Sequence, residues 1–194
     1  MLRTRMGRFV TGLVAAAACL AAAFEGPGTE AHLPSQAAAD LLREAAGADG
    51  AFLAAGLVKE AYQANDLSSI LQYPTDELVT VGLKGSQIKQ AFERAVSLYP
   101  EQNTSFLQIS GFEATFSKGA APGQRILSIT AGGARLDESR TYMVAMPNTL
   151  GRGGLGYFKI WDKSKIVKTH GQTVEDVLKG KKYVETAPRW SAQS

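Results

Sequence analysis

The pattern that most constrains the fold is a series of four strand-like segments that follow one another with no helical stretch between them. They cover residues 106–109, 112–116, 125–130 and 142–146. Each segment is rich in β-branched or aromatic residues, and glycine-containing turns such as Gly132-Gly133 separate them. A doubly wound parallel sheet needs a helix between successive strands, so this order predicts an α+β fold instead.

Two amphipathic helices precede these strands. One is predicted over residues 35–46, with Ser35 as its N-cap and Gly47 at its end, and the other begins at Gly85. Shorter elements are expected at residues 51–55, 66–71, 77–83 and, behind a capping box opened by Thr173, at 173–178. Together they predict a single compact α+β domain over residues 33–194, in which helices pack on a mixed sheet.

The first 23 residues have the layout of a secretory signal peptide. Three arginines precede an uncharged apolar run that is shorter than the roughly 18 residues of a membrane span. Cleavage after residue 23 leaves residues 24–32 as a linker. Alternatively, cleavage before Cys19 gives a lipoprotein, although Ala16 stands where such signals have a large aliphatic residue, or Cys19 simply fills the apolar run. The protein is therefore expected to be exported: periplasmic, extracellular or lipid-anchored at the cell envelope.

The sequence lacks the side chains that several catalytic and metal sites need. Cys19 is the only cysteine, so the domain has no thiol nucleophile and no structural zinc site of cysteines. Two histidines, His32 and His170, cannot supply the ligand cluster of a two-metal phosphoesterase. Removing the leader's three arginines from the 21 basic residues leaves 18, against 18 acidic residues. That balance argues against a nucleic-acid binder, which should carry a basic surplus.

Four glycines between residues 151 and 156 have the composition of a phosphate-binding loop. Such a loop runs from a strand directly into a helix, whose N-terminus holds the phosphate. The aromatic stretch at residues 157–161 favours a strand instead. The glycines are therefore expected to form a tight turn between packed elements.

Four ordered segments carry a more specific signal. They are Ala38-Ala39-Asp40 with Gly47-Ala48-Asp49, Leu78 to Phe92, Phe106 to Gly111 with Pro122 to Ile126, and Tyr142 to Ala145 with Asn148 and Gly153-Gly154-Leu155-Gly156-Tyr157. In order and spacing they resemble the C-terminal domain of 5′-nucleotidases and related periplasmic nucleotide hydrolases. The resemblance covers nearly all of the chain from residue 33 onward. It implies that domain's fold, standing alone without the metallophosphatase domain that carries the family's two divalent metals.

The resemblance also implies a set of substrate-binding residues. In the family this domain holds the nucleoside, with the base between two aromatic rings, and the matching residues here are Tyr73 and Tyr157. Asp162 corresponds to the acidic residue that binds the ribose hydroxyls. Lys59 stands where the family has an arginine that reaches the phosphate, and it offers a point charge without the bidentate fork.

Two polar positions of the family are apolar in this chain. Ala54 replaces the asparagine that contacts substrate, and Leu155 replaces the aspartate of the Gly-Gly-Asp-Gly turn. The stacking half of the site is kept while its polar half is eroded. Tyr73 and Tyr157 are either a working clamp or half-exposed aromatics inherited with the fold, and Lys59 is either a ligand or a solvated surface lysine.

Three functions of different classes fit this pattern. The chain is an exported module that captures a nucleoside or nucleotide without catalysis of its own, or half of a split nucleotide hydrolase that pairs with a separate metallophosphatase chain. The third is a degenerate structural or interaction domain. No catalytic residue, metal or cofactor is expected in this chain, and no phosphate hydrolysis by it alone. Nucleic acid is not an expected partner, and a membrane is one only through a lipid on Cys19.

Overall fold

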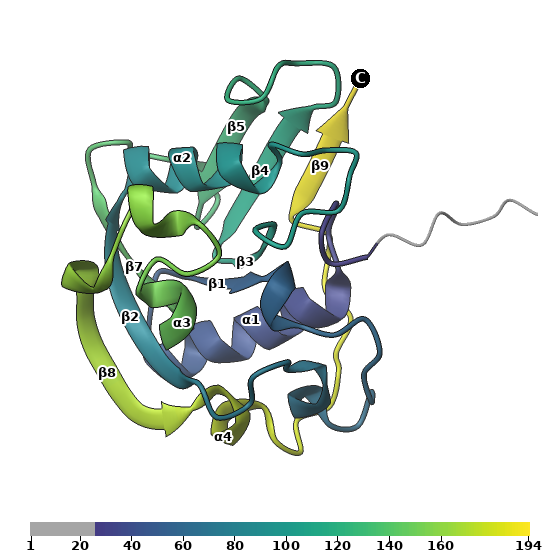
Figure 1. Ribbon diagram of the computed structural model, residues 1–194, viewed down its shortest axis with the longest axis vertical. Coiled ribbons are helices and arrows are strands. Elements are labelled where there is room, and N and C mark those ends of the chain that lie inside the picture. Colours follow the sequence, from purple (N-terminus) through teal and green to yellow (C-terminus); the bar gives the residue numbers. More distant parts are fainter. Residues whose placement is uncertain (1–25) are drawn as a thin grey trace, which may run out of the picture.

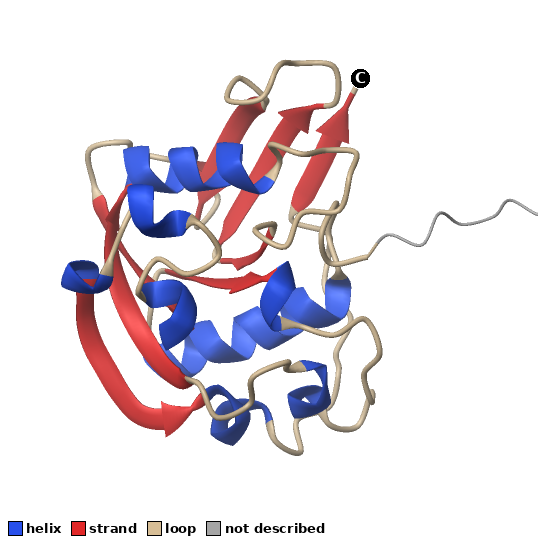
Figure 2. Cartoon of the chain, viewed as in Figure 1, coloured by secondary structure: helices blue, strands red, loops and turns tan. Residues whose placement is uncertain are grey.

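The computed structural model describes residues 26–194, and the predicted signal peptide with Cys19 lies outside that range. The described chain forms two β-sheets with helices packed around them (Figures 1 and 2). Both sheets contain parallel as well as antiparallel pairs. The predicted α+β fold with a mixed sheet is thus confirmed, with two mixed sheets in place of one.

The larger sheet has five strands in the order β3-β1-β7-β2-β8. They are β1 (Gly50–Ala54), β2 (Glu77–Lys84), β3 (Leu107–Ser110), β7 (Thr141–Pro147) and β8 (Ile166–Thr173). β1 runs parallel to β7, and the other neighbouring strands are antiparallel. β1 is buried along its whole length, whereas β8 is an edge strand in which no residue is buried.

The smaller sheet has the order β6-β5-β4-β9. Its strands are β4 (Phe112–Ser117), β5 (Ile126–Ala131), β6 (Ala134–Arg135) and β9 (Trp190–Gln193). Only Gly111 separates β3 of the larger sheet from β4. Its φ is +76°, and a Cβ there would collide with the backbone carbonyl of Asp49. Glycine is therefore required where the chain passes from one sheet to the other.

Helices connect the strands and cover their faces. They are α1 (Leu33–Ala46), α2 (Gly85–Ala95), α3 (Asn148–Gly151) and α4 (Val174–Leu178), with short 3-10 turns η1 (Ala55–Leu57), η2 (Leu67–Ile70), η3 (Tyr157–Lys159) and η4 (Lys163–Lys165). α1 packs on β1 and β3 of the larger sheet (Figure 1). The capping box predicted for α4 is confirmed, because Thr173 and Asp176 each accept the other's backbone N–H. Ser35 does not cap α1; His32 precedes the helix, and Ser35 is buried in its first turn.

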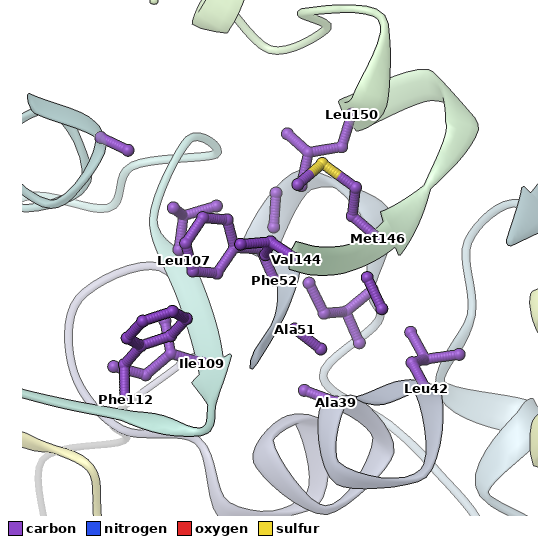
Figure 3. Packing of buried hydrophobic residues seen from close by; sticks show 14 of the residues in the cluster. Ala39, Leu42, Ala51, Phe52, Leu107, Ile109, Phe112, Val144, Met146 and Leu150 are labelled. Atoms are coloured by element: carbon purple, nitrogen blue, oxygen red, sulfur yellow. The ribbon is translucent and has the colours of Figure 1, made fainter. Parts of the chain in front are cut away.

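Aromatic residues join the two sheets into one core. Phe52 of β1 lies 5.6 Å from Phe92 of α2 and 5.8 Å from Phe112 of β4, between ring centroids. Trp190 of β9 packs on Phe92 at 5.0 Å, and its indole Nε1 donates to the Leu107 carbonyl of β3 at 2.7 Å. Trp190 thus ties the smaller sheet to the larger one. Figure 3 shows part of this cluster, including Phe52, Phe112, Leu107, Ile109, Val144, Met146, Ala39 and Leu42.

The segment predicted as a linker at residues 24–32 belongs to the domain where the structure describes it. Residues 26–28 are buried. The side-chain amide of Gln108, itself fully buried, donates to the Pro27 and Glu30 carbonyls at 2.8 Å each. These hydrogen bonds attach residues 26–32 of the predicted linker to β3 of the domain.

Three further differences concern strands. Residues 157–161, predicted as a strand, contain the 3-10 turn η3, and strands β8 and β9 were not predicted at all. Tyr157 and Trp161 are buried while Lys159 between them is exposed, which fits the periodicity of a helical turn and not that of a strand. Among the helices of residues 26–194, none has the length and apolar character that a membrane crossing requires.

Candidate functional site

The glycine-rich stretch after α3 is a tight turn, as predicted. Gly153, Leu155 and Gly156 all have positive φ, at 86°, 55° and 82°. A Cβ at Gly156 would overlap the guanidinium of Arg94, so this position requires glycine for space as well as for backbone conformation. The turn places the side chain of Tyr157 in the protein interior.

Tyr157 is fully buried. Trp161 stacks on it at 4.6 Å between centroids and 15° between planes, and the Arg94 guanidinium lies 5.4 Å from the ring centroid. The hydroxyl donates to the backbone carbonyl of Ser105. Burial raises the pKa of this hydroxyl far above its usual range. This placement differs from the predicted one, in which Tyr157 faces a bound base, because the turn directs the ring inward.

Arg94 and Ser105 hold the turn in place, and the sequence analysis did not identify either residue. Arg94 Nη2 donates to the Leu155 carbonyl at 2.9 Å and to Ser105 Oγ at 3.1 Å. Ser105 Oγ donates to the same Leu155 carbonyl at 2.8 Å. The two contacts to the Leu155 carbonyl join residues 61 and 50 positions apart in the chain, so no local pattern could have revealed them.

Tyr73 lies on the loop between η2 and β2, and 55% of its surface is exposed. Asp76 fixes this loop: its backbone N–H donates to the Tyr73 carbonyl at 3.3 Å, and its carboxylate accepts the Thr149 N–H of α3 at 3.0 Å. The loop is therefore anchored to the start of the segment that leads to Tyr157. The Tyr73 ring, unlike that of Tyr157, is open to solvent and can stack on a planar ligand.

Lys59 lies on the segment next to the Tyr73 loop. Its backbone N–H donates to the Ile70 carbonyl at 2.8 Å, and the Gln72 N–H donates to the Leu57 carbonyl at 2.9 Å. The structure thus brings together the segments that carry Lys59 and Tyr73. A cavity of about 150 Å³ lies beside Lys59, and its lining includes the neighbouring residues Val58 and Glu60.

Asp162 is exposed and precedes η4. Its carboxylate accepts the backbone N–H of Ser164 at 2.7 Å, and it is the N-cap of this short turn. Hydrogen bonds from the side chain and backbone of Ser164 lower the pKa of Asp162, so the group is ionised at neutral pH. One carboxylate oxygen is engaged in the cap, and the other remains able to accept from a diol.

The two positions that depart from the family are both apolar contacts. Ala54 is fully buried in β1 and contributes no surface to a ligand. Leu155 reaches over Gly56, where an added Cβ would lie 3.1 Å from its Cδ2 atom. A leucine at positive φ is uncommon, and this packing together with the Arg94 hydrogen bond offsets the cost of that conformation.

The protein is a two-sheet domain in which a loop carries the exposed Tyr73 and a glycine-rich turn carries the buried Tyr157. Within residues 26–194, no three His, Cys, Asp or Glu side chains are grouped so that they could hold a metal ion. The family described as 5′-nucleotidase, C-terminal domain matches residues 26–163. The chain belongs to this family.

Relatives of known sequence agree with this assignment. The chain is 31% identical over 125 residues to the trifunctional nucleotide phosphoesterase protein YfkN of Bacillus subtilis, covering 59% of this chain and 8% of that protein. It is 32% identical over 93 residues to the human 5′-nucleotidase, covering 43% of this chain and 16% of that enzyme. The chain therefore spans only a small part of the curated relatives that it matches.

Solved structures share the fold. The 5′-nucleotidase precursor of Thermus thermophilus superposes with a TM-score of 0.62 at 22% identity, over 87% of this chain and 39% of that one. The NAD nucleotidase of Haemophilus influenzae gives a TM-score of 0.60 at 16% identity, over 87% of this chain and 37% of that one. In both cases the match is to a part of a longer protein.

Proposed function

We propose that this chain is an exported recognition domain that binds a nucleoside or nucleotide by stacking its base on Tyr73, and that it does not catalyse hydrolysis alone. The observation that carries the proposal is the exposure of Tyr73, at 55%, on a loop fixed by Asp76. Lys59, on the adjacent segment, supplies a positive charge for a phosphate. Asp162 supplies a carboxylate for the ribose hydroxyls.

A base that stacks on Tyr73 alone should bind more weakly than a base held between two aromatic rings. Stacking of one base on one aromatic ring contributes about 1–3 kcal/mol. Tyr157 already stacks on Trp161 and adds no second face. With few further anchors, dissociation constants from about micromolar to about millimolar are expected. Such affinity suits a domain that concentrates substrate for a partner rather than one that retains it.

A calorimetric and thermal-shift titration of the purified protein with adenosine and AMP tests the proposal. We expect both ligands to raise the melting temperature of the wild type, because a ligand that binds only the folded state stabilises it. Tyr73→Ala should abolish the shift. Phe158→Ala is the matched control, since Phe158 is 64% exposed and should leave binding unchanged. Equal shifts in wild type and Tyr73→Ala would contradict stacking on Tyr73. No shift at millimolar ligand would leave the chain a structural or interaction domain.

The second candidate function is half of a split nucleotide hydrolase. It is favoured by membership of a family that is described as the C-terminal domain of 5′-nucleotidases. A separate metallophosphatase chain would then supply the metals and the catalysis. Mixing the two chains should give phosphate release from AMP that neither gives alone. Metal-dependent release by this chain alone would contradict both candidates.

Export is part of the proposal and has its own test. The predicted leader ends either after residue 23 or before Cys19, and in the second case the cysteine carries lipid. Mass spectrometry of the mature N-terminus from the native host distinguishes the two products. A full-length chain starting at Met1 would refute export.

A further inference from the structure

Charge is unevenly distributed along the domain. Residues 152–182 contain eight lysines and arginines against three acidic residues, whereas residues 26–151 contain nine basic against thirteen acidic residues. The near neutrality of the whole domain therefore conceals a positively charged C-terminal part. This segregation indicates a surface that prefers a negatively charged partner.

Six exposed residues at the start of this part form what we call the basic–aromatic patch. They are Arg152, Phe158, Lys159, Lys163, Lys165 and Lys168. They belong to the turn after α3, to η3, to η4 and to β8, which follow one another along one side of the molecule, with β8 at the sheet edge (Figure 1). Five of these exposed residues carry a positive charge, and the sixth is a phenylalanine.

The positive charges of the patch are not neutralised by neighbouring acids. The three salt bridges found within residues 26–194 join other pairs, namely Lys89–Glu138, Arg140–Asp49 and Arg189–Asp40. Asp162 is the one acidic residue between residues 152 and 174, and its carboxylate accepts hydrogen bonds from Ser164. The patch therefore keeps a strong net positive charge.

Phe158 has no packing role that explains its presence. Its neighbours Tyr157 and Trp161 are buried, at 0% and 2% exposure, while Phe158 is 64% exposed. An exposed aromatic ring on a segment rich in exposed lysines is typical of a protein that meets a membrane surface, where the ring lies among the headgroups and the ammonium groups bind phosphates.

We infer that the basic–aromatic patch attaches this protein to an anionic lipid surface. The chemistry recognised is a layer of lipid phosphates with apolar material beneath it. Phe158 distinguishes such a layer from free phosphate, which offers nothing for a phenyl ring. None of the six residues lines the three cavities of about 480, 330 and 150 Å³ described for residues 26–194. A membrane, unlike a small ligand, needs no cavity.

Sedimentation of the purified protein with vesicles tests the inference. Vesicles of phosphatidylcholine alone are compared with vesicles that contain about 30% phosphatidylglycerol, at about 0.1 M and about 1 M salt. We expect binding to the anionic vesicles only, and at low salt only. Each lysine near an anionic surface strengthens attachment about fivefold, so Lys159→Gln with Lys163→Gln and Lys165→Gln should weaken it about 100-fold.

Two further variants distinguish binding through the basic–aromatic patch from binding through positive charge elsewhere on the protein. Changing Lys179, Lys181 and Lys182 to glutamine removes the same charge elsewhere and should weaken binding far less. Phe158→Ala should weaken it about tenfold with the charge unchanged. Melting temperatures of all variants should match the wild type, because the altered side chains are exposed.

Several results would overturn the inference. Equal binding to neutral and anionic vesicles, or equal losses in the two triple variants, would contradict a localised lipid site. Release from vesicles by millimolar inorganic phosphate at constant ionic strength would assign the lysines to a soluble anion. Binding to a purified acidic protein, with no binding to either vesicle, would assign the patch to a protein partner.

Discussion

Replacing Tyr157 by phenylalanine separates a structural tyrosine from a ligand-binding one. The substitution removes only the hydroxyl, which donates to the Ser105 carbonyl, and leaves the ring stacked on Trp161. The hydrogen bond is buried, so the Ser105 carbonyl loses a partner that water does not replace. Leaving such a group unsatisfied costs about 1–3 kcal/mol. Tyr157→Ala also removes the ring and should cost about 3–5 kcal/mol.

Urea unfolding followed by tryptophan fluorescence measures these losses. The midpoint should fall for Tyr157→Phe, and the slope with urea should stay constant, since the surface exposed on unfolding is nearly the same. Tyr73→Phe is the matched control, because the same atom is removed from a side chain that is 55% exposed, and the change should lie within about 0.5 kcal/mol. A Tyr157→Phe variant as stable as the wild type, or one that loses adenosine binding without losing stability, would refute the reasoning.

Three other predictions concern the turn, the joint between the sheets and pH. Gly156→Ala should destabilise by about 1–3 kcal/mol in the same assay, because its φ is +82° and its Cβ would displace Arg94. Trp190→Phe should cost about 1–3 kcal/mol by leaving the Leu107 carbonyl unpaired, and a change within error would contradict the proposed joint. Burial lowers the pKa of His32, so the unfolded chain takes up a proton that the folded protein resists, and stability should fall as pH drops below about 6.5. His32→Gln should flatten that slope, as measured by urea midpoints between about pH 7.5 and about pH 5.5.

Local patterns predicted those parts of the fold that depend on neighbouring residues. The strand β2 and the capping box at Thr173 were visible in the sequence, and the structure confirms both elements. β2 is buried on both faces, however, and not half-buried as its alternation of apolar and polar residues predicted. β8 was missed because an edge strand exposes both of its faces and shows no apolar alternation. β9 was missed because it has only four residues and is held in place by the packing of Trp190 on Phe92, almost 100 positions away in the chain.

The candidate site also combines features that the sequence predicts with features that it does not. Its residues follow from the family resemblance, but whether a given tyrosine faces solvent or core does not. Tyr73 and Tyr157 are the same residue type, yet the first is 55% exposed and the second fully buried. The difference arises from Arg94 and Ser105, which hold the Leu155 carbonyl from distant parts of the chain. Long-range hydrogen bonds of this kind leave no periodic trace in a sequence.

The most direct test of the central claim is a crystal structure of the protein grown with adenosine. The account predicts an adenine ring stacked on Tyr73 from one side, with Tyr157 still buried against Trp161. An adenine ring held between Tyr73 and an outward-turned Tyr157 would contradict the structural role assigned to Tyr157. An adenosine bound away from Tyr73 would contradict the recognition proposal itself.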